Sequence, residues 1–503
     1  YGPLAPHGAA FVGLYALFTG LAHAISFGRV ERSPALVVAV TLIVLLFLAM
    51  IGLFVLTLWT ALRDMSGRDL PDGRRQILFF TAGAGLCLLL LPRLFSKDVL
   101  SYLVYGQMHG AYGLNPYINN PNNVQFDYTF RLIDWHYEAS VYGPVWTLLC
   151  TGLYKLAAPL ATTHIWGYIV AFRAVGLLLH LANVALIWSI LGRLRPRQQV
   201  AGTIFYAWNP LALIEFPGNG HNDVALVFFL LAAIAAHLRG RPALVALCLA
   251  LSVLTKFITV LVVPAYLLLL WRNEATVRAR LSAWARAGAV GLAAFALLWA
   301  PFYEVWRDPL FLLRSSAASR YDNSLLEIAY WGLRHLFAVV LPRETGDEIA
   351  NTLIKTAGRV AFLAIWAWLT WRVRDTEGWI RASFWILFAY LVVGTAWFWP
   401  WYVTWLVGLA PLVGGRRATA ATLTFSASVL VIYVLWGNQL PFDRGSLYPL
   451  HNIVAFGLPL LALWLQLRRG GPPGEPVYAP AASGDDKGRG ARGHGRGAWG
   501  VRA

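Results

Sequence analysis

Charged side chains are scarce in this sequence of 503 residues, because Asp, Glu, Lys and Arg together make up only 13% of it. A soluble domain usually carries about 25% of these residues. Hydrophobic residues account for 58% of the chain, the mean hydropathy is +0.58, and the apolar residues gather in runs of about twenty, the length of a membrane-spanning helix. This composition excludes a set of soluble domains and predicts an all-α, polytopic helical membrane protein.

Cysteine and acidic residues are also few. The three cysteines, Cys87, Cys150 and Cys248, lie far apart in apolar surroundings, so they predict neither a disulfide framework nor a metal site. Lys and Arg outnumber Asp and Glu by 41 to 24, a net charge of +17. Because the basic residues are scattered between apolar runs, they indicate cytoplasmic loops and contact with anionic lipid, and no nucleic-acid partner is expected.

Apolar length and the positions of Lys and Arg predict about fourteen spans, with both termini in the cytoplasm. Residues 1–76 are expected to form an N-terminal transmembrane hairpin and a cytoplasmic loop. Within it, Phe11–Phe27 is expected to be a span, because no small-residue cleavage site of a signal peptide follows it. Residues 77–467 are expected to form the catalytic membrane domain. Residues 468–503, rich in Gly, Pro and Arg, are expected to be a disordered basic cytoplasmic tail.

Three apolar segments need a specific interpretation. A crossing at 143–160 would place the arginines at 193–197 outside, so we expect an interfacial helix there; one basic loop on the wrong side is the alternative. Residues 242–270 are long enough for one tilted span, but arginines flank both ends. We therefore expect two half-depth helices that turn near Thr255–Lys256. Residues 200–216 are expected to form one uninterrupted span.

In this topology the unusual polar and aromatic features share the external side. They are two long external segments, 96–142 and 302–352, the turn Gly218–Asp223, the lysine Lys256 and the aromatic turn Trp397–Tyr402. We therefore expect a multi-pass protein of the plasma (inner) membrane, with its active site on the external or periplasmic face.

Asp98 is the first acid after the apolar run that ends near Leu91. A carboxylate at the water boundary can stay ionised and take a proton from a sugar hydroxyl, which is a poor nucleophile. Such general-base help contributes roughly 10²–10⁴-fold to a rate. The alternative is a structural role, in which Ser96 or Asp98 caps a helix expected over Val99–Gly106.

Other candidates would bind substrate. His221, Asn222 and Asp223 would hold the acceptor or a metal; the alternative is a turn whose Asp caps the next helix. Lys256 lies in a long apolar stretch, where a lysine is costly unless it meets water or an anion. It is therefore a candidate phosphate clamp, with Arg320 as a second candidate; snorkelling of Lys256 to the interface is the alternative.

The remaining candidates are aromatic. Trp399, Trp401 and Tyr402 are dense enough to form a platform for a sugar or a polyprenyl chain, although aromatic residues at a span boundary are most often membrane anchors. Tyr321 neighbours Arg320 in the second external segment, and Tyr105 lies in the first. Both are expected to contact substrate.

In this order, the residues resemble the GT-C membrane glycosyltransferases over roughly residues 77–470. The chain is most similar to the bacterial polyprenyl-phosphate-mannose-dependent α-mannosyltransferases of cell-envelope lipoglycan synthesis. The resemblance is carried by Asp98, Tyr105-Gly106, Gly113, Asn115-Pro116-Tyr117, Tyr142-Gly143-Pro144-Val145, Gly220-His221-Asn222-Asp223, Leu254-Thr255-Lys256-Phe257 and Pro400-Trp401-Tyr402.

The resemblance implies an inverting glycosyltransferase with Asp98 as its base. The enzyme would move a sugar, expected to be mannose, from a polyprenyl-phosphate donor to a lipid-linked or envelope glycan acceptor at the outer face of the membrane. The expected partners are therefore this donor, a glycan or glycolipid acceptor, and membrane lipid.

No cofactor is expected. The oligosaccharyltransferase branch of GT-C enzymes carries a metal-binding Asp-x-Asp, where this chain has His221-Asn222-Asp223, and the difference argues against a required metal. The chain shows no Rossmann-type glycine fingerprint, as expected if the donor is not a nucleotide-sugar.

Two other functions remain open. A transporter or flippase of a lipid-linked glycan would need matched halves with interrupted helices, and no internal repeat is evident. An O-antigen polymerase or ligase-type enzyme would not explain the early aspartate loop.

Overall fold

The computed structural model describes residues 4–27, 34–64, 72–92, 95–159, 165–307, 320–436 and 450–469. Within these ranges every regular element is a helix, and the one β contact is an isolated bridge between Asp322 and Trp397. The all-α prediction is confirmed. The predicted tail lies outside the described residues from 470 onward.

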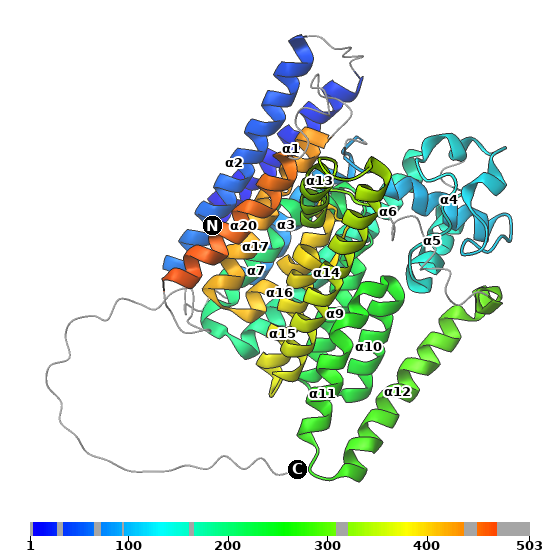
Figure 1. Cartoon of the computed structure of the whole chain (residues 1–503). Coiled ribbons are helices and arrows are strands. Elements are labelled where there is room, and N and C mark those ends of the chain that lie inside the picture. The colour runs from blue at the N-terminus through cyan, green and yellow to red at the C-terminus, as the bar shows by residue number, and fades with distance from the viewer. Residues whose placement is uncertain are drawn as a thin grey trace, which may run out of the picture.

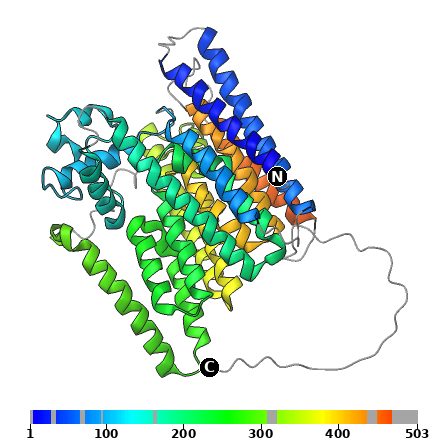
Figure 2. The same ribbon diagram turned by 180° about the vertical axis from the view of Figure 1, so that it is seen from behind.

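The α-helices are α1 (Ala5–Phe27), α2 (Pro34–Asp64), α3 (Gly73–Leu89), α4 (Asp98–Gly110), α5 (Pro144–Ala157), α6 (Trp166–Leu194), α7 (Gln199–Ala207), α8 (Pro210–Leu213), α9 (Asp223–His237), α10 (Pro242–Thr255), α11 (Val263–Asn273), α12 (Val277–Trp299), α13 (Leu325–Phe337), α14 (Arg343–Trp371), α15 (Thr376–Ala389), α16 (Thr404–Val413), α17 (Arg416–Ser428), α18 (Leu430–Trp436) and α20 (Leu450–Arg468). Short 3₁₀ segments are η1 (Pro121–Val124), η2 (Tyr128–Leu132), η3 (Pro196–Gln198), η5 (Phe257–Val262), η6 (Ala300–Arg307) and η10 (Pro400–Val403), and π segments are η4 (Ile214–Gly218) and η9 (Tyr390–Gly394). Figure 1 shows the elements in one view, and Figure 2 shows them from behind.

Seven of the described helices are long and apolar enough to cross a membrane, and Pro210–Gly218 (α8 and η4) with α9, bent by 114°, would make an eighth span. A polytopic membrane protein fits this finding. Shorter apolar helices at Pro242–Thr255, Phe257–Asn273 and Pro400–Val413 accompany them. The predicted total of about fourteen spans stays a prediction.

Basic residues gather at one end of the helix bundle. The contacts that join them are Arg193 to the carbonyl oxygen of Leu238 (2.9 Å), Arg272 to the carbonyl oxygen of Trp371 (2.9 Å) and Arg195 to the carboxylate of Glu377 (3.0 Å). They bring together the end of α6, the α9–α10 turn, the end of α11 and the α14–α15 turn. These basic turns therefore lie at one end of the bundle, and their cytoplasmic location stays a prediction.

The first long polar segment leaves and re-enters the bundle at the opposite end. Arg173, buried near the start of α6, donates a hydrogen bond from Nη1 to the carbonyl oxygen of Leu89 (3.1 Å) and another to that of Leu91, at the end of α3. The end of α3 and the start of α6 are therefore neighbours. The intervening α4 and α5 pack on each other beside this end (Figures 1 and 2). This path agrees with an α5 that does not cross to the basic end, and its place in the interface stays a prediction.

The predicted break near Thr255–Lys256 is present. Helix α10 ends at Thr255, Lys256 is extended with φ −152° and ψ 116°, and η5 leads into α11. The start of α5 meets this break, because Gly143 N–H donates to the carbonyl oxygen of Thr255 (3.0 Å). A Cβ atom at Gly143 would lie 2.0 Å from the carbonyl oxygen of Leu254, so only glycine permits this approach.

One expectation about a continuous segment is wrong. The stretch 200–216 is not one span, because Asn209 accepts hydrogen bonds from the N–H groups of Leu211 and Ala212, and Pro210 starts a new short helix. The second long segment, 302–352, contains α13 and the start of α14. Its external location stays a prediction.

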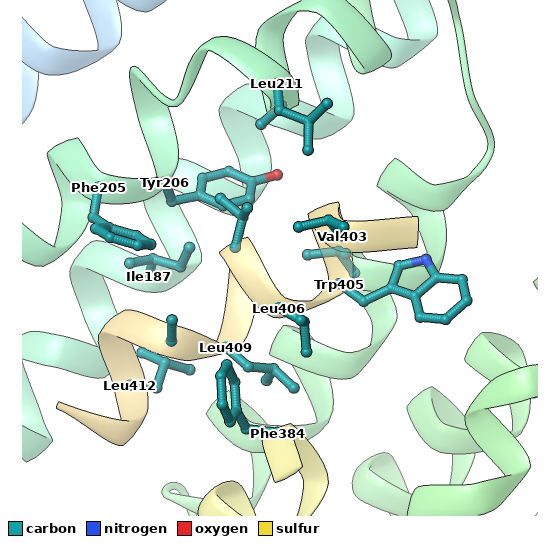
Figure 3. Close-up of a cluster of buried hydrophobic side chains, with 14 of the residues drawn as sticks. Ile187, Phe205, Tyr206, Leu211, Phe384, Val403, Trp405, Leu406, Leu409 and Leu412 are labelled. Atoms are coloured by element: carbon teal, nitrogen blue, oxygen red, sulfur yellow. The ribbon is translucent and has the colours of Figure 1, made fainter. Parts of the chain in front are cut away.

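The core is centred on α16, whose ten residues are all buried. A helix that is apolar all round must be surrounded by other elements. Figure 3 shows Leu406 and Leu409 of α16 near Phe384 of α15, and Trp405 pointing to the side away from Phe205. The aromatic turn that precedes α16 is therefore attached to a fully enclosed helix.

Candidate active site

The polar turn after η4 sets two titratable side chains next to each other. Asn219 N–H donates to the carbonyl oxygen of Ile214 (2.8 Å), and His221 N–H donates to that of Glu215 (2.9 Å). Gly220 has φ +75°, a left-handed conformation that glycine adopts without strain. This wide π turn folds the chain back, so that the side chains of Glu215 and His221 meet.

Asp98 begins α4 but does not cap it. Its backbone N–H donates to Ser96 Oγ (3.2 Å), so Ser96 satisfies an N–H at the start of the helix, and the N-cap residue Lys97 makes no side-chain cap hydrogen bond. The carboxylate faces the turn instead, because its Oδ2 accepts a hydrogen bond from the Tyr142 hydroxyl (3.4 Å) and lies 3.7 Å from His221 Nδ1. The side chain is 17% exposed, and no described residue donates a hydrogen bond to Oδ1. That oxygen can therefore meet a substrate.

Burial raises the pKa of the Asp98 carboxyl from 3.8 to about 6. The positive charge of Lys256 lowers this pKa, the negative charge of Asp223 raises it, and the hydrogen bond from Tyr142 lowers it. The net result is a carboxylate that is ionised at neutral pH yet basic enough to accept a proton during a reaction.

His221 is completely buried between two carboxyl groups. Its ring stacks on Trp401 with 4.0 Å between centroids, and Nε2 lies 3.4 Å from Glu215 Oε2. Glu215 is also fully buried and accepts hydrogen bonds from the Tyr433 hydroxyl (2.6 Å) and from Asn219 Nδ2 (2.8 Å). The histidine therefore links a buried acid to the partly exposed Asp98.

Lys256 is held by a buried acid. Its Nζ lies 2.8 and 3.0 Å from the two carboxylate oxygens of Asp223, which also accepts a hydrogen bond from Trp405 Nε1. The same Nζ lies 4.5 Å from the centroid of the Tyr402 ring. The Lys256 side chain is 17% exposed and that of Asp223 is fully buried. Snorkelling to the interface alone does not describe this lysine, because its charge is paired inside the protein.

Most of the predicted residues meet in one cluster through these contacts. Its members are Asp98, His221, Asp223, Lys256, Trp401 and Tyr402. Trp399 joins it by stacking on Trp401 at 5.1 Å. Asn222 is buried beside His221 with both side-chain amide atoms unpartnered, and Tyr105 donates its hydroxyl to the carbonyl oxygen of Glu138 (2.9 Å).

Arg320 and Tyr321 make no contact with this cluster. Arg320 is exposed, and its guanidinium carbon lies 5.5 Å from the centroid of the Trp135 ring in the first external segment. Tyr321 stacks on Tyr330 at 4.5 Å and donates its hydroxyl to Asn351 O (3.3 Å), so it faces α13 and α14.

The residue after Tyr321 ties this segment to the aromatic turn. Asp322 N–H donates to the carbonyl oxygen of Ala396 (2.9 Å), and Phe398 N–H donates to that of Asp322 (2.9 Å). Trp135 lies 5.7 Å from Trp397 between ring centroids. Arg320 is thus near the rim of the aromatic turn rather than beside Lys256.

Sequence reasoning missed three participants. Glu215 carried a usable signal, because an acid within an apolar run is costly and marks a functional position. Tyr433 and Trp405 carried no such signal, since an aromatic residue in an apolar helix is ordinary.

Within the described ranges no group of three or more His, Cys, Asp or Glu side chains is arranged to hold a metal ion, and we derive no metal-dependent step.

Comparison with known proteins supplies a family. A family model described as "Alpha-(1->6)-mannopyranosyltransferase, N-terminal domain" matches residues 7–272, more than half of the chain. The chain is 27% identical over 435 residues to alpha-(1->6)-mannopyranosyltransferase A of Mycobacterium tuberculosis (strain ATCC 25618 / H37Rv), covering 82% of this chain and 80% of that protein. It is also 27% identical over 401 residues to a second alpha-(1->6)-mannopyranosyltransferase of that organism, covering 75% of this chain and 60% of that protein.

The buried pair predicts a stability effect. Lys256→Met leaves Asp223 as a buried carboxylate without its cation, and breaking such a pair costs about 3–5 kcal/mol. The remaining hydrogen bond from Trp405 will reduce this cost. We expect a lower unfolding temperature for purified protein in detergent, and recovery in the Asp223→Asn, Lys256→Met double variant. A single variant as stable as its parent would contradict the buried pair.

Proposed function

The chain belongs to the α-(1→6)-mannopyranosyltransferase family, and on that premise we propose that it transfers mannose from a polyprenyl-phosphate donor to a glycan or glycolipid acceptor of the cell envelope. The observation that carries the proposal is Asp98, a partly exposed carboxylate with a raised pKa, next to a lysine in a membrane-embedded fold. The names of the relatives support mannose and an α-(1→6) linkage.

In the proposed reaction Asp98 Oδ1 removes the proton from the acceptor hydroxyl while its oxygen attacks the anomeric carbon. The bond between that carbon and the phosphate oxygen breaks, and its electron pair leaves with polyprenyl phosphate. Attack opposite the leaving group inverts the anomeric centre. An α-linked product therefore requires a β-linked donor.

Lys256 is proposed to contact the donor phosphate. Two of its three N–H groups are directed at Asp223, and the side chain retains 17% exposure, so an ammonium N–H remains for a phosphate oxygen. Asp223 then serves to orient Lys256 rather than to bind substrate itself. The ammonium also stabilises the negative charge that develops on the leaving phosphate.

The aromatic turn is proposed to guide the sugars. Trp399 and Trp401 are stacked on each other, and Trp401 covers the ring of His221, so the turn approaches the base directly. Tyr402, stacked on Trp405 at 4.9 Å, is proposed to hold Lys256 in place. Arg320 is proposed as a contact for the acceptor at the rim.

Four further predicted contacts have weaker geometric support. Asn222 and His221 belong to the turn at the base, and we propose that they shape it. Tyr105 is engaged with the backbone of the first segment and is proposed to support that loop. Tyr321 faces α13 and α14 and is proposed to anchor the segment that carries Arg320.

We propose that the active site faces the external side of the plasma membrane and that both termini are cytoplasmic. The support is the separation of the cluster around Asp98 from the basic end of the bundle, together with the tendency of basic loops to stay in the cytoplasm. A lipid-linked donor would then enter from the outer leaflet.

The role of Asp98 predicts the effect of one substitution. Asp98→Asn keeps the size of the side chain but cannot accept the proton, so single-turnover mannosyl transfer by the purified protein should fall roughly 10²-fold or more. Binding of polyprenyl-phosphate mannose should stay near that of the parent. The matched control is Asp72→Asn, the same exchange at an exposed acid before α3. Near-parental transfer by Asp98→Asn would remove Asp98 as the base.

The sidedness predicts a labelling pattern. In a chain whose native cysteines are replaced by serine, Tyr137→Cys lies in the first external segment at a residue that is 75% exposed, and Arg197→Cys lies at the exposed basic end. A membrane-impermeant maleimide applied to intact cells should label residue 137 and leave residue 197 unlabelled until the cells are opened. The reverse pattern would invert the proposed topology.

A further inference from the structure

One buried acid beside the proposed base has no part in the transfer step described above. Glu215 lies on η4, its carboxyl group is completely buried, and its Oε2 is 3.4 Å from His221 Nε2. The other ring nitrogen, Nδ1, is 3.7 Å from Asp98 Oδ2. Both ring nitrogens are buried and have no hydrogen bond of ordinary length. The imidazole thus lies between the two carboxyl groups, and it needs both of them to satisfy the hydrogen-bonding capacity of its two nitrogens.

The surroundings of Glu215 favour a neutral acid. No described Lys or Arg forms an ion pair with it. Tyr433 donates to Oε1 and Asn219 donates to Oε2, but both donors are uncharged. A buried carboxylate without a cation is costly, whereas a carboxylic acid there gains a proton that it can donate.

The other groups around His221 do not supply this proton. Trp401 covers one face of the ring. The Tyr102 hydroxyl accepts a hydrogen bond from the Asn222 backbone N–H (3.4 Å). Asp223 and Lys256 hold each other, and the Tyr142 hydroxyl donates to Asp98. Of the groups named here, Glu215 is the acid that faces Nε2.

We propose that Glu215 is a positioning residue: as a neutral acid it donates to His221 Nε2, which fixes the ring as the Nδ1–H tautomer and directs that N–H at Asp98 Oδ2. The inference rests on the proposed function, in which Asp98 is the base. Neither the 3.4 Å nor the 3.7 Å separation is a formed hydrogen bond in this structure, and catalytic contacts often tighten only when substrate binds.

This arrangement divides the two oxygens of Asp98 between two tasks. Oδ2 receives the Tyr142 hydroxyl and the His221 N–H, which stabilise the carboxylate and fix its orientation. Oδ1 remains for the acceptor proton. The proton of Glu215 does not leave during transfer, so no additional proton donor or acceptor is required. A hydrogen bond donated to the ionised carboxylate favours that form, so the His221 N–H acts in the same direction as the Tyr142 hydroxyl.

The test uses two substitutions at position 215 in the full-length purified protein. Glu215→Gln remains uncharged and offers one amide N–H to His221 and the other to Asn219, whose side-chain amide turns to present its oxygen. Because the donor to His221 is preserved, kcat should stay within about threefold of the parent. Glu215→Leu removes the hydrogen-bond donor to His221 Nε2, so the proton of the ring is no longer fixed on Nδ1. It should lower kcat about tenfold or more, the effect of losing a hydrogen bond to a charged group, and move the acidic limb of the pH profile upward. KM for the donor should change little in both.

A second pair of variants guards against a misfolded Leu variant. His221→Asn places an amide nitrogen near the position of Nδ1. It should therefore retain more activity than His221→Leu, and its activity should fall at a lower pH on the acidic side of the profile. Equal pH profiles for these two variants would overturn the proposal. So would an inactive Glu215→Gln, which would require a charged Glu215, or a Glu215→Leu with parental kcat and pH profile. Full activity of Asp98→Asn would instead reject the proposed base, so the two failures are distinguishable.

Discussion

The Lys256–Asp223 ion pair is the interaction on which the geometry of the candidate site depends. Asp223 begins α9, and Lys256 lies where α10 breaks, so the pair joins two helix ends inside an apolar bundle. Two charges can be buried there only because each has the other and further donors, here Trp405 and the face of Tyr402. The requirement to satisfy both charges thus holds the turn after η4, the α10 break and the aromatic turn together.

The aromatic turn contributes rigidity as well as surface. Trp401 stacks on His221, and Trp405 contacts Asp223 from α16, a helix enclosed on every side. A side chain mounted on such a helix has little freedom to move. The aromatic side chains of the candidate site are therefore mounted on a fixed helix, whereas Asp98 lies at the start of α4, in the first long polar segment.

The sequence allowed part of this site to be predicted, and the reason is energetic. Asp98 and Lys256 were conspicuous because charges are rare in an apolar chain and are retained at a cost. The break at Thr255–Lys256 followed from arginines at both ends of one apolar stretch. The pairing of Lys256 with Asp223 did not follow, because 32 intervening residues carry no signal of which helix ends meet.

Other features depended on tertiary packing. The interruption at Asn209–Pro210 was overlooked although both residues favour a helix start, because the apolar run continued beyond them. Glu215 was visible as an anomaly, but its relation to His221 comes from the π turn and the left-handed Gly220. Arg320 was grouped with Lys256 by its expected side of the membrane, and sidedness does not specify contact.

The pH dependence of mannosyl transfer tests the central claim, that Asp98 is the base, most directly. Burial raises the pKa of its carboxyl to about 6, so the ionised form is lost as the pH falls through that value. The proposed donor is a phosphodiester, which stays ionised over this range. With purified protein, kcat/KM should therefore be constant above neutrality and fall tenfold per pH unit below about 6. A profile that stays flat to pH 4.5 would contradict the account.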